Sequence, residues 1–409
     1  MVPLSRNQAL LLTTLLLTQV MAPVAGIAAD KPFEQTIGIT SNEILIGSCA
    51  PLSGQMKERG SQVVAGGRLY FDYINDKGGI NGRKIKLISC DDKYDANAAI
   101  ECFNANLKDK VFMGALFQGT APATKYVKMA EANRMPAVGF STGGDFITNP
   151  VNPYVFQVRA GYFAEAAEQV DTLLNSLGAK RVVVVYQNDA YGATGREGAL
   201  KALKKFNAKP VAEISLPRLT HNFEPIIKQI ADTKADAVIL AVAGDALSLL
   251  AEKRADMGRD VQLVAFSVGT DLLMKEAEGK ADGTIITQVI PLTQNKLPTV
   301  QLYKKLEEKY NHAEPTMSGF EGFVIGMVVV EGLKRSGREL TRDGFIKAME
   351  SIHNLDVGLG PKFKISYSHE NHEGFSGGVY WTALKGGKLD NVTNWKSFMA
   401  TKKVVGTAN

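Results

Sequence analysis

The stretch RKIKLISCDDKYDANAAIECFNANLKD, residues 83–109, decides the fold class. It begins with an apolar run of β-strand length, which ends in two adjacent carboxylates, Asp91 and Asp92. The residues that follow have the spacing of an amphipathic helix, and either Asp95 or Asn97 is placed to cap it. A strand followed directly by a helix is the repeating unit of α/β folds.

The same unit recurs through most of the chain. The expected strands span residues 43–50, 83–90, 111–117, 135–140, 181–187, 236–243, 262–267 and 283–290. Helices are expected between them, including residues 61–79 and 162–178. The later strands are continuously apolar rather than alternating, which indicates a parallel sheet buried on both faces. Because an extended, proline-bearing segment at residues 149–161 separates two such series, the sequence predicts an α/β fold with two doubly wound parallel-sheet lobes.

The composition is that of an ordinary globular protein. The 409 residues are 45% hydrophobic and 22% charged, and a chain of this length favours two domains. The net charge of +5 is mild, and lysines and arginines are scattered along the chain. This charge pattern argues against nucleic-acid binding.

The first 29 residues have the pattern of a secretory signal peptide. They contain one charge, Arg6, then a short apolar core and a small-residue stretch, so we expect cleavage after Ala28 or Ala29. The alternative is an uncleaved membrane anchor, which Pro23 and several polar residues in the core disfavour. We therefore expect a soluble protein exported to the periplasm.

The three cysteines suit an oxidising compartment. Cys90 closes a predicted strand and Cys102 lies in the following helix, so they are the candidate disulfide pair, which leaves Cys49 free. None of the three has the spacing of a metal site.

Two motifs suggest enzymes but lack the required context. A nicotinamide-binding site needs a glycine-rich turn after the first strand, and GSCAPLSGQMKERG at residues 47–60 does not supply it. GFSTG at residues 139–143 matches the nucleophile motif of serine hydrolases around Ser141. That motif requires a helix directly afterwards, which Pro150 and Pro153 prevent. A hydrolase stays the less favoured alternative.

The segment HENHE, residues 369–373, places two histidines three residues apart in a strand-like region. The zinc motif requires a spacing of four on a helix, so a solvated turn is the better interpretation. No phosphate-binding loop is present in the sequence. We expect no metal, no cofactor and no enzymatic activity.

Several stretches in order along the chain resemble one known family. They are ILIGSCAPLSG (44–54), AGGRLYFDYINDKGGINGRKIKLISCDDKYDANAA (65–99), GALFQGTAPAT (114–124), MPAVGFSTGGDF (135–146), YVFQVRAG (154–161) and VVVVYQNDAYGATGREGALKAL (182–203). Together they resemble the periplasmic solute-binding proteins of the branched-chain amino-acid (Leu/Ile/Val) type, which serve ABC importers. The resemblance implies the type I periplasmic-binding-protein fold. In that fold three hinge crossings join two lobes, and a small ligand binds between them without being chemically changed.

The resemblance also implies boundaries and partners. The first lobe would comprise residues 43–158 and 289–376, and the second residues 159–288 and 377–399. The hinge crossings would fall at residues 155–161, 287–292 and 375–380. The protein would act as a monomer and deliver its ligand to a permease in the inner membrane. The alternative is a sensor whose closed form is presented to a membrane signalling receptor.

Carried over position by position, the family's carboxylate anchor in the first lobe falls on two loops. These loops contain the candidate ligand-binding residues Gln118, Gly119, Thr120, Ser141 and Thr142. Their short hydroxyls and backbone N–H groups would bind an anion without a fixed positive charge.

From the second lobe, the aromatic wall of the family's site matches Tyr191, for which core packing is the alternative. In the family, an acidic residue of the second lobe pairs with the ammonium group of the ligand, and no residue of this sequence clearly matches it. The corresponding loop offers Ser267 and no acid before Asp271. Asp245 is a possible substitute, unless it only caps the helix that follows. The ligand could therefore be an amino acid, an amide, or a carboxylate with an apolar or aromatic body.

Overall fold

The computed structural model describes residues 36–405, except residues 219, 259–260, 277–279, 362 and 376–377. The expected signal peptide, residues 1–29, lies outside the described residues. Within the described part of the chain, no helix combines the length and the apolar character needed to cross a membrane.

The first sheet has five strands in the order β2-β1-β3-β4-β5. They are β1 (Glu43–Ala50), β2 (Lys84–Asp91), β3 (Met113–Gln118), β4 (Ala137–Ser141) and β5 (Val155–Phe156). All neighbouring strands in it run parallel. Their carboxyl ends therefore meet along one edge of the sheet.

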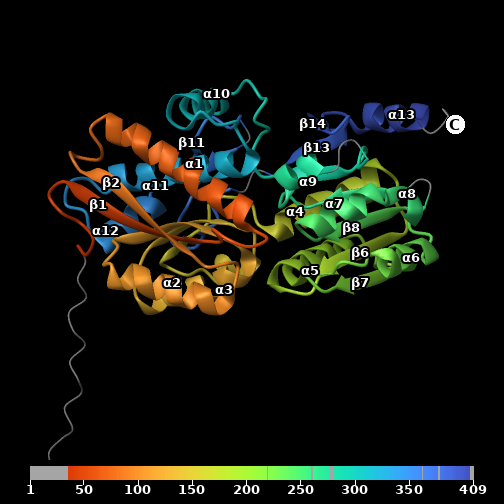
Figure 1. The fold of residues 1–409 in the computed structure, drawn as a ribbon, viewed down its shortest axis with the longest axis horizontal. Helices are drawn as coiled ribbons and strands as arrows, with labels where there is room; N and C mark the ends of the chain where they lie inside the picture. The colour runs from red at the N-terminus through yellow and green to blue at the C-terminus, as the bar shows by residue number, and fades with distance from the viewer. Residues whose placement is uncertain are drawn as a thin grey trace, which may run out of the picture. The chain divides into compact units, whose positions relative to one another are not determined.

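Helices cover both faces of this sheet (Figure 1). On one side lie α2 (Ala96–Lys108) and α3 (Thr120–Ala132), and on the other α1 (Lys57–Asp76), α11 (Met317–Arg335) and α12 (Arg342–Glu350). Ile44 and Ile46 of β1 belong to the hydrophobic cluster that contains α1 and α11, whereas Cys49 belongs to the cluster of α2 and α3. Helices α1 and α11 pack closely, because a Cβ atom at Gly66 would collide with the carbonyl oxygen of Gly319.

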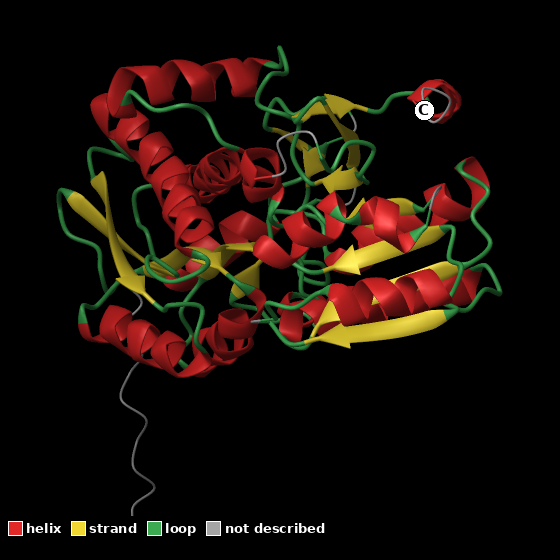
Figure 2. Ribbon diagram, turned by 45° about the vertical axis from the view of Figure 1, so that its right-hand side comes forward, coloured by secondary structure: helices red, strands yellow, loops and turns green. Residues whose placement is uncertain are grey.

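The second sheet has the order β14-β13-β10-β9-β8-β6-β7. Its parallel part is β6 (Val182–Gln187), β7 (Ala212–Leu216), β8 (Ala237–Ala241), β9 (Gln262–Ala265) and β10 (Ile285–Gln288). Two antiparallel strands, β13 (Tyr380–Lys385) and β14 (Lys388–Asn391), extend one edge. Figure 2 shows the strands of both sheets between layers of helix.

The second sheet is also buried on both faces, as its continuous apolar strands predict. Val182 and Val184 of β6 belong to the cluster that contains α4 (Tyr162–Asp171) and α5 (Ala190–Lys205). Val183 and Val185 belong to the cluster of the opposite face. The helices of that face are α6 (Glu224–Asp232), α7 (Asp245–Glu252), α8 (Arg254–Met257) and α9 (Thr270–Glu276).

The chain passes between the two sheets three times. It leaves the first sheet after β5, returns after β10, and enters the second sheet again at β13.

The remaining elements are η1 (Asp145–Ile147), η2 (Thr172–Ser176), α10 (Pro298–Leu306), η3 (Glu307–Asn311), the pair β11 (Leu355–Asp356) and β12 (Lys364–Ile365), and α13 (Trp395–Val405). The predicted α/β fold with two parallel-sheet halves is confirmed, and the residue boundaries of the lobes stay a prediction.

Candidate functional site

A cavity lies where loops at the carboxyl ends of strands from both sheets converge. It encloses about 400 Å³ of space free of protein atoms, part of it open to solvent. The lining residues are Gln55, Met56, Tyr94, Gln118, Gly119, Thr120, Ser141, Thr142, Tyr162, Gln187, Tyr191, Arg218, Ala243 and Val268. Ligand sites of open α/β sheets form beyond these strand ends.

Six of the eight residues predicted from the sequence line this cavity. They are Gln118, Gly119, Thr120, Ser141, Thr142 and Tyr191. Gln118 and Ser141 are the last residues of β3 and β4 and face each other in the sheet register. Gly119 follows with a φ of 100° and forms the N-cap of α3. A side chain there would be excluded, because a Cβ atom would lie 2.6 Å from a ring carbon of Tyr94.

The backbone is kinked directly before these residues. Leu116 in β3 has a φ of 61°, and Gly139 in β4 has a φ of 75°. The two residues occupy the one position where the β3–β4 pairing is interrupted. A non-glycine residue in the left-handed region costs about 1–3 kcal/mol, and such strain is concentrated at functional sites. The residues that end both strands after the kink, Gln118 and Ser141, line the cavity.

Three hydroxyl groups form a chain along the cavity wall. The Thr120 and Thr142 Oγ1 atoms lie 2.6 Å apart, and Thr142 Oγ1 lies 3.1 Å from the Tyr162 hydroxyl. Gln157 holds this chain in place by donating to the Thr142 carbonyl oxygen at 2.6 Å. Three hydroxyls bring three hydrogens, and the two bonds between them use two. One O–H is therefore left to donate to a ligand.

Ser141 is held from behind by a guanidinium group. Arg59 Nη2 donates to Ser141 Oγ at 2.9 Å and to Glu321 Oε2 at 2.8 Å. Since the arginine is the donor, the hydroxyl hydrogen of Ser141 is free to point toward the cavity. Arginine cannot accept a proton at neutral pH, so this contact does not activate Ser141 as a nucleophile.

Aromatic rings form the wall that the second sheet contributes. The rings of Tyr162 and Tyr191 meet edge to face with centroids 5.2 Å apart, and Phe266 packs behind them. Burial raises the pKa of Tyr191 well above its usual value. Within the described part of the chain, the Tyr191 hydroxyl and Gln118 Oε1 are buried without a hydrogen-bond partner. Buried polar atoms normally have partners, so a bound ligand is the natural partner for both.

The charge of the lining comes from arginine. Arg218, in the loop after β7, places its guanidinium carbon 5.0 Å from the ring centre of Tyr94. Among the lining residues there is no carboxylate. The cavity thus combines one cation, short hydroxyls and aromatic surface.

Comparisons with known proteins match this arrangement. Residues 43–388 match the periplasmic binding protein family. The chain belongs to that family. The Leu/Ile/Val-binding protein homolog 3 of Brucella melitensis is 25% identical over 339 residues, which cover 80% of this chain and 89% of the relative.

Solved structures show the same fold. A possible leucine/isoleucine/valine-binding protein from Rhodopirellula baltica has a TM-score of 0.81 at 24% identity, covering 88% of this chain and 98% of that one. A solute-binding protein of an ABC transporter from R. palustris, in complex with benzoate, has a TM-score of 0.75 at 22% identity, covering 86% and 96%. The fold of this periplasmic binding protein is therefore that of type I members, as expected.

Two predicted site residues of this periplasmic binding protein lie outside the cavity lining. Asp245 is exposed in the first turn of α7, and Gly244 rather than Asp245 occupies the N-cap. Ser267 is buried, and its hydroxyl accepts from Arg159 at 2.6 Å and donates to Glu165 at 3.0 Å. Asp271 also lies outside the lining. None of these residues supplies the cavity with an acidic partner for an ammonium group.

Ser267 belongs to a buried ion-pair cluster next to the first crossing. Arg159 pairs with Glu165 of α4 and with Glu321 of α11. Burial alone would lower the pKa of Arg159, but Glu321 and Glu165 outweigh it and raise that pKa. Thr287 in β10 also donates to Glu165, at 2.7 Å. The cluster joins helices that cover different sheets.

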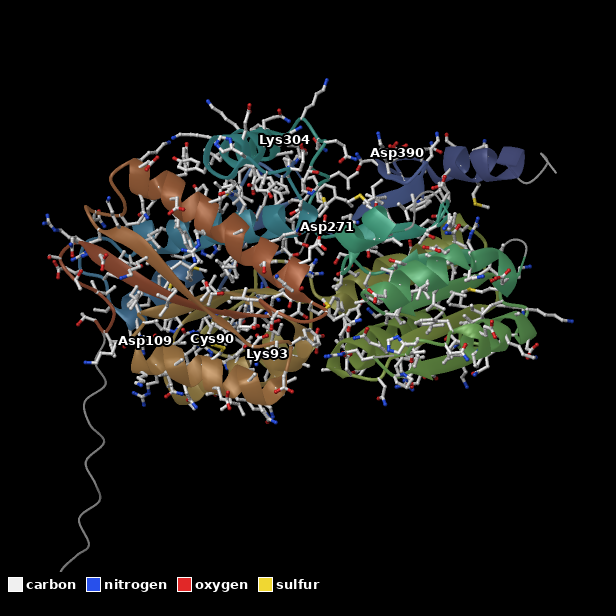
Figure 3. The ribbon with its side chains drawn as sticks, in the orientation of Figure 1. Cys90, Lys93, Asp109, Asp271, Lys304 and Asp390 are labelled. Atoms are coloured by element: carbon white, nitrogen blue, oxygen red, sulfur yellow. A yellow bond between two sulfur atoms is a disulfide. The ribbon has the colours of Figure 1, made fainter. Side chains whose placement is uncertain are left out.

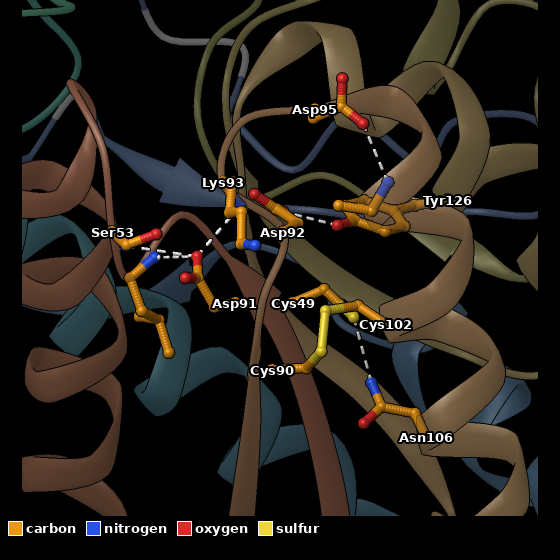
Figure 4. The surroundings of a disulfide bond; sticks show 12 residues. Cys49, Ser53, Cys90, Asp91, Asp92, Lys93, Asp95, Cys102, Asn106 and Tyr126 are labelled. Atoms are coloured by element: carbon orange, nitrogen blue, oxygen red, sulfur yellow. Dashed lines mark hydrogen bonds between the residues drawn. A yellow bond between two sulfur atoms is a disulfide. The ribbon is translucent and has the colours of Figure 1, made fainter.

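The carboxylates at the end of β2 shape the loop that carries Tyr94 (Figure 4). Asp91 accepts from three backbone N–H groups, two of them in the loop after β1. Asp92 accepts from the N–H of Tyr94 at 2.8 Å and from the hydroxyl of Tyr126 at 2.5 Å. Asp95 caps α2, as one of the two sequence alternatives has it. These three carboxylates thus have partners within the protein that build the loop.

The same region contains the disulfide. The structure joins Cys90 to Cys102, with Cα atoms 5.4 Å apart, and leaves Cys49 free and buried. Asn106 donates to Cys49 Sγ at 3.2 Å. Burial shields the Cys49 thiol and raises its pKa, so we expect it to be unreactive in the folded protein.

The two histidines of HENHE differ in burial but share one neighbour, because Glu350 Oε1 lies 3.4 Å from His372 Nε2 and 3.3 Å from His369 Nδ1. His372 is buried, and its Nδ1 lies 3.0 Å and 2.9 Å from the carbonyl oxygens of Asn152 and Val155. Its ring stacks on Phe156. His369 is exposed and lies 3.3 Å from Glu350. His372 therefore fills a structural position in the first half of the fold.

Eight lining residues were not singled out from the sequence. They are Gln55, Met56, Tyr94, Tyr162, Gln187, Arg218, Ala243 and Val268. All eight lie within six residues of the carboxyl end of a parallel strand. The rule that ligands bind beyond strand ends would have found them, although it also selects residues that do not reach the cavity.

Proposed function

We propose that this protein is an exported substrate-binding protein. It captures a small polar or amphipathic solute between its two lobes and delivers it to an ABC importer in the inner membrane. The observation that carries the proposal is the cavity at the strand ends of both sheets, with hydroxyl donors on one wall and tyrosines on the other. Family membership supports the same role.

The proposed mechanism is closure of the two lobes on the ligand. The lobes comprise residues 43–158 with 289–376 and residues 159–288 with 377–399, and the protein acts as a monomer. A ligand that contacts both lobes stabilises the closed form, which a permease can recognise. Micromolar affinity corresponds to about 8 kcal/mol, which several buried hydrogen bonds and apolar burial can supply.

The proposed ligand is an amino acid, an amide or a carboxylate. The relative from Brucella is named for leucine, isoleucine and valine, and the R. palustris protein holds benzoate. Both kinds of ligand contain a carboxylate beside an apolar body. The hydroxyl chain through Thr120 and Thr142 and the aromatic wall at Tyr191 suit those two parts.

A binding assay tests the proposal. A thermal-shift screen of amino acids, amides and carboxylates identifies a ligand, since a compound that binds only the folded state raises the melting temperature. Calorimetry then compares Thr142→Ala and Tyr191→Ala with the unchanged protein. We expect each substitution to weaken binding by about 1–3 kcal/mol.

The matched controls are Thr233→Ala and Tyr310→Ala, which alter residues outside the cavity lining. We expect both controls to bind like the unchanged protein. Unchanged affinity in both site variants would show that the ligand binds elsewhere. Consumption of a bound compound would contradict a binding role.

A further inference from the structure

We propose that the ligand is a small organic carboxylate without an ammonium group, and that Arg218 determines this preference. The inference rests on the proposed binding function and narrows its ligand class. It assigns a role to a second-sheet arginine that was not among the residues expected from the sequence.

The charge of the lining disfavours a zwitterion, although Gln118 Oε1 offers one neutral acceptor. Arg218 is the one ionised side chain among the described residues that line the cavity, and none of the others is acidic. An ammonium group taken out of water needs an anionic partner or several acceptors. The acidic candidates Asp245 and Asp271 both lie outside the lining. Binding an amino acid would therefore place its ammonium beside a cation and no carboxylate.

The charge of Arg218 is only partly balanced, because Asp95, which caps α2, interacts with it electrostatically but not as an ion pair. In the part of the chain that the structure describes, no carboxylate lies within ion-pair distance of its guanidinium, which is half-buried against the Tyr94 ring. Stacking occupies the flat face of a guanidinium and leaves the N–H groups at its edge free. That edge matches the two oxygens of a carboxylate.

The second arginine near the site does not compete for this role. Arg59 lies behind Ser141, and its charge is balanced by Glu321 at 2.8 Å. It orients the Ser141 hydroxyl but contributes little net potential. Arg218 is consequently the group that makes the cavity electropositive. An anion inside it would receive hydroxyl hydrogen bonds from the first sheet and a counter-charge from the second.

The uncharged part of the cavity wall determines which non-carboxylate part of the ligand fits. The rings of Tyr94, Tyr162 and Tyr191 line the cavity together with the apolar side chains of Met56 and Val268. Flat aromatic or unsaturated groups bury well against such walls. The structure therefore favours carboxylates with an aromatic or short apolar body over hydroxy acids and sugars.

The test uses sets of compounds that differ in one group. Benzoate is compared with benzamide, and 3-phenylpropanoate with 3-phenylpropanamide and with L-phenylalanine, by thermal shift and then calorimetry. We expect at least one carboxylate to bind ten times more tightly than its amide or its amino-acid counterpart. If no carboxylate raises the melting temperature, or if phenylalanine binds as tightly as 3-phenylpropanoate, the inference is wrong.

Substitution of Arg218 tests whether this residue causes the preference for carboxylates. Arg218→Gln should weaken carboxylate binding at least tenfold, leave amide binding unchanged, and reduce the dependence of carboxylate affinity on NaCl. Arg218→Lys should restore part of the affinity. The matched control is Arg196→Gln, since Arg196 pairs with Glu213 and lies outside the cavity lining. Unchanged carboxylate affinity in Arg218→Gln would overturn the inference.

Binding data distinguish failure of the inference about Arg218 from failure of the proposed function. Suppose that amino acids or amides bind, that Thr142→Ala weakens their binding, and that Arg218→Gln does not. In that case the inference is wrong, but the proposed binding function stands. If no compound of any class binds, both fail.

Discussion

Asp92 shows how burial changes the chemistry of a single carboxyl group. It is fully buried behind the cavity loop and accepts a hydrogen bond from Tyr126. Desolvation raises the pKa of Asp92 to about 6, although the bonds from Tyr126 and Tyr94 oppose the rise. Its environment therefore disfavours the ionised form, and the nucleotide role suggested by its place after a strand has no support.

The first prediction follows from this shift. The folded protein retains the Asp92 proton to a higher pH than the unfolded chain, so the free energy of unfolding falls as pH rises from about 4 to about 6. A shift of about two units corresponds to roughly 3 kcal/mol. Asp92→Asn should remove most of this fall, as measured by urea denaturation at several pH values.

The control for this measurement is Asp109→Asn, which alters an exposed carboxylate at the end of α2. It should leave the pH dependence unchanged. If Asp92→Asn and the unchanged protein have the same pH dependence between pH 4 and 6, Asp92 does not titrate in that window.

The second prediction concerns the thiols. In the folded protein a thiol reagent should find no reactive group among the described residues, because Cys49 is buried and Cys90 is bonded to Cys102. Unfolding without reductant should expose one thiol, and unfolding with reductant three. Replacing both Cys90 and Cys102 with serine should lower the free energy of unfolding by about 3 kcal/mol. Three reactive thiols before reduction would contradict the pairing.

At the scale of elements, the sequence predicted the strands that are buried on both faces. The runs that became β1, β3, β4, β6, β8, β9 and β10 are continuously apolar, and burial alone makes them recognisable. The edge strand β2 was also predicted, from the apolar run that ends at Cys90, whereas the edge strand β7 was missed because its two buried apolar residues stand among polar ones. The predicted helix at residues 162–178 is α4 followed by the π-turn η2.

The candidate site was predictable where it follows a motif at a strand end. The loops after β3 and β4 carry short hydroxyl residues next to glycine, and they line the cavity. The position of Ser267 could not be predicted from a motif. Its hydroxyl bonds to Arg159, which lies in the first crossing and pairs with Glu165 of α4, and the sequence does not show that these residues meet. Arg218 was not predicted as a site residue because it follows β7, the edge strand that was not predicted from the sequence.

The third prediction concerns a contact between α9 and α11. Asp271, labelled in Figure 3, accepts from the N–H groups of Met317 and Ser318 at 2.9 Å each and from the Ser318 hydroxyl at 2.6 Å. It satisfies donors at the start of α11 that the helix itself leaves unpaired. Asp271→Ala should cost about 1 kcal/mol in the free energy of unfolding.

This contact should also affect binding, because it joins an element of the second half to one of the first. About 1 kcal/mol corresponds to roughly a fivefold loss of ligand affinity. The matched control is Asp282→Ala, whose carboxylate accepts from Gly386 and Gly387 within the second half. Calorimetry that finds equal affinities in both variants would show that the Asp271 contact does not assist closure.

At the scale of the whole molecule, two half-structures of similar design share one cavity. Three crossings connect them, and the cluster of Arg159, Glu165 and Glu321 lies beside the first crossing. Removing one partner of a buried ion pair lowers the free energy of unfolding by about 3–5 kcal/mol. The cluster therefore stabilises the position of the first crossing. A site assembled from both halves can exist only while they approach each other, so the proposed closure predicts that binding changes the distance between them.

The measurement that tests this claim most directly is the distance between the halves in solution. Spin labels at Glu131→Cys on α3 and Lys204→Cys on α5 lie at exposed positions, and Cys49 is too buried to react with the label. A saturating ligand from the screen should shift the distance distribution toward a shorter, narrower separation. Distributions that are identical with and without bound ligand would contradict the proposed closure.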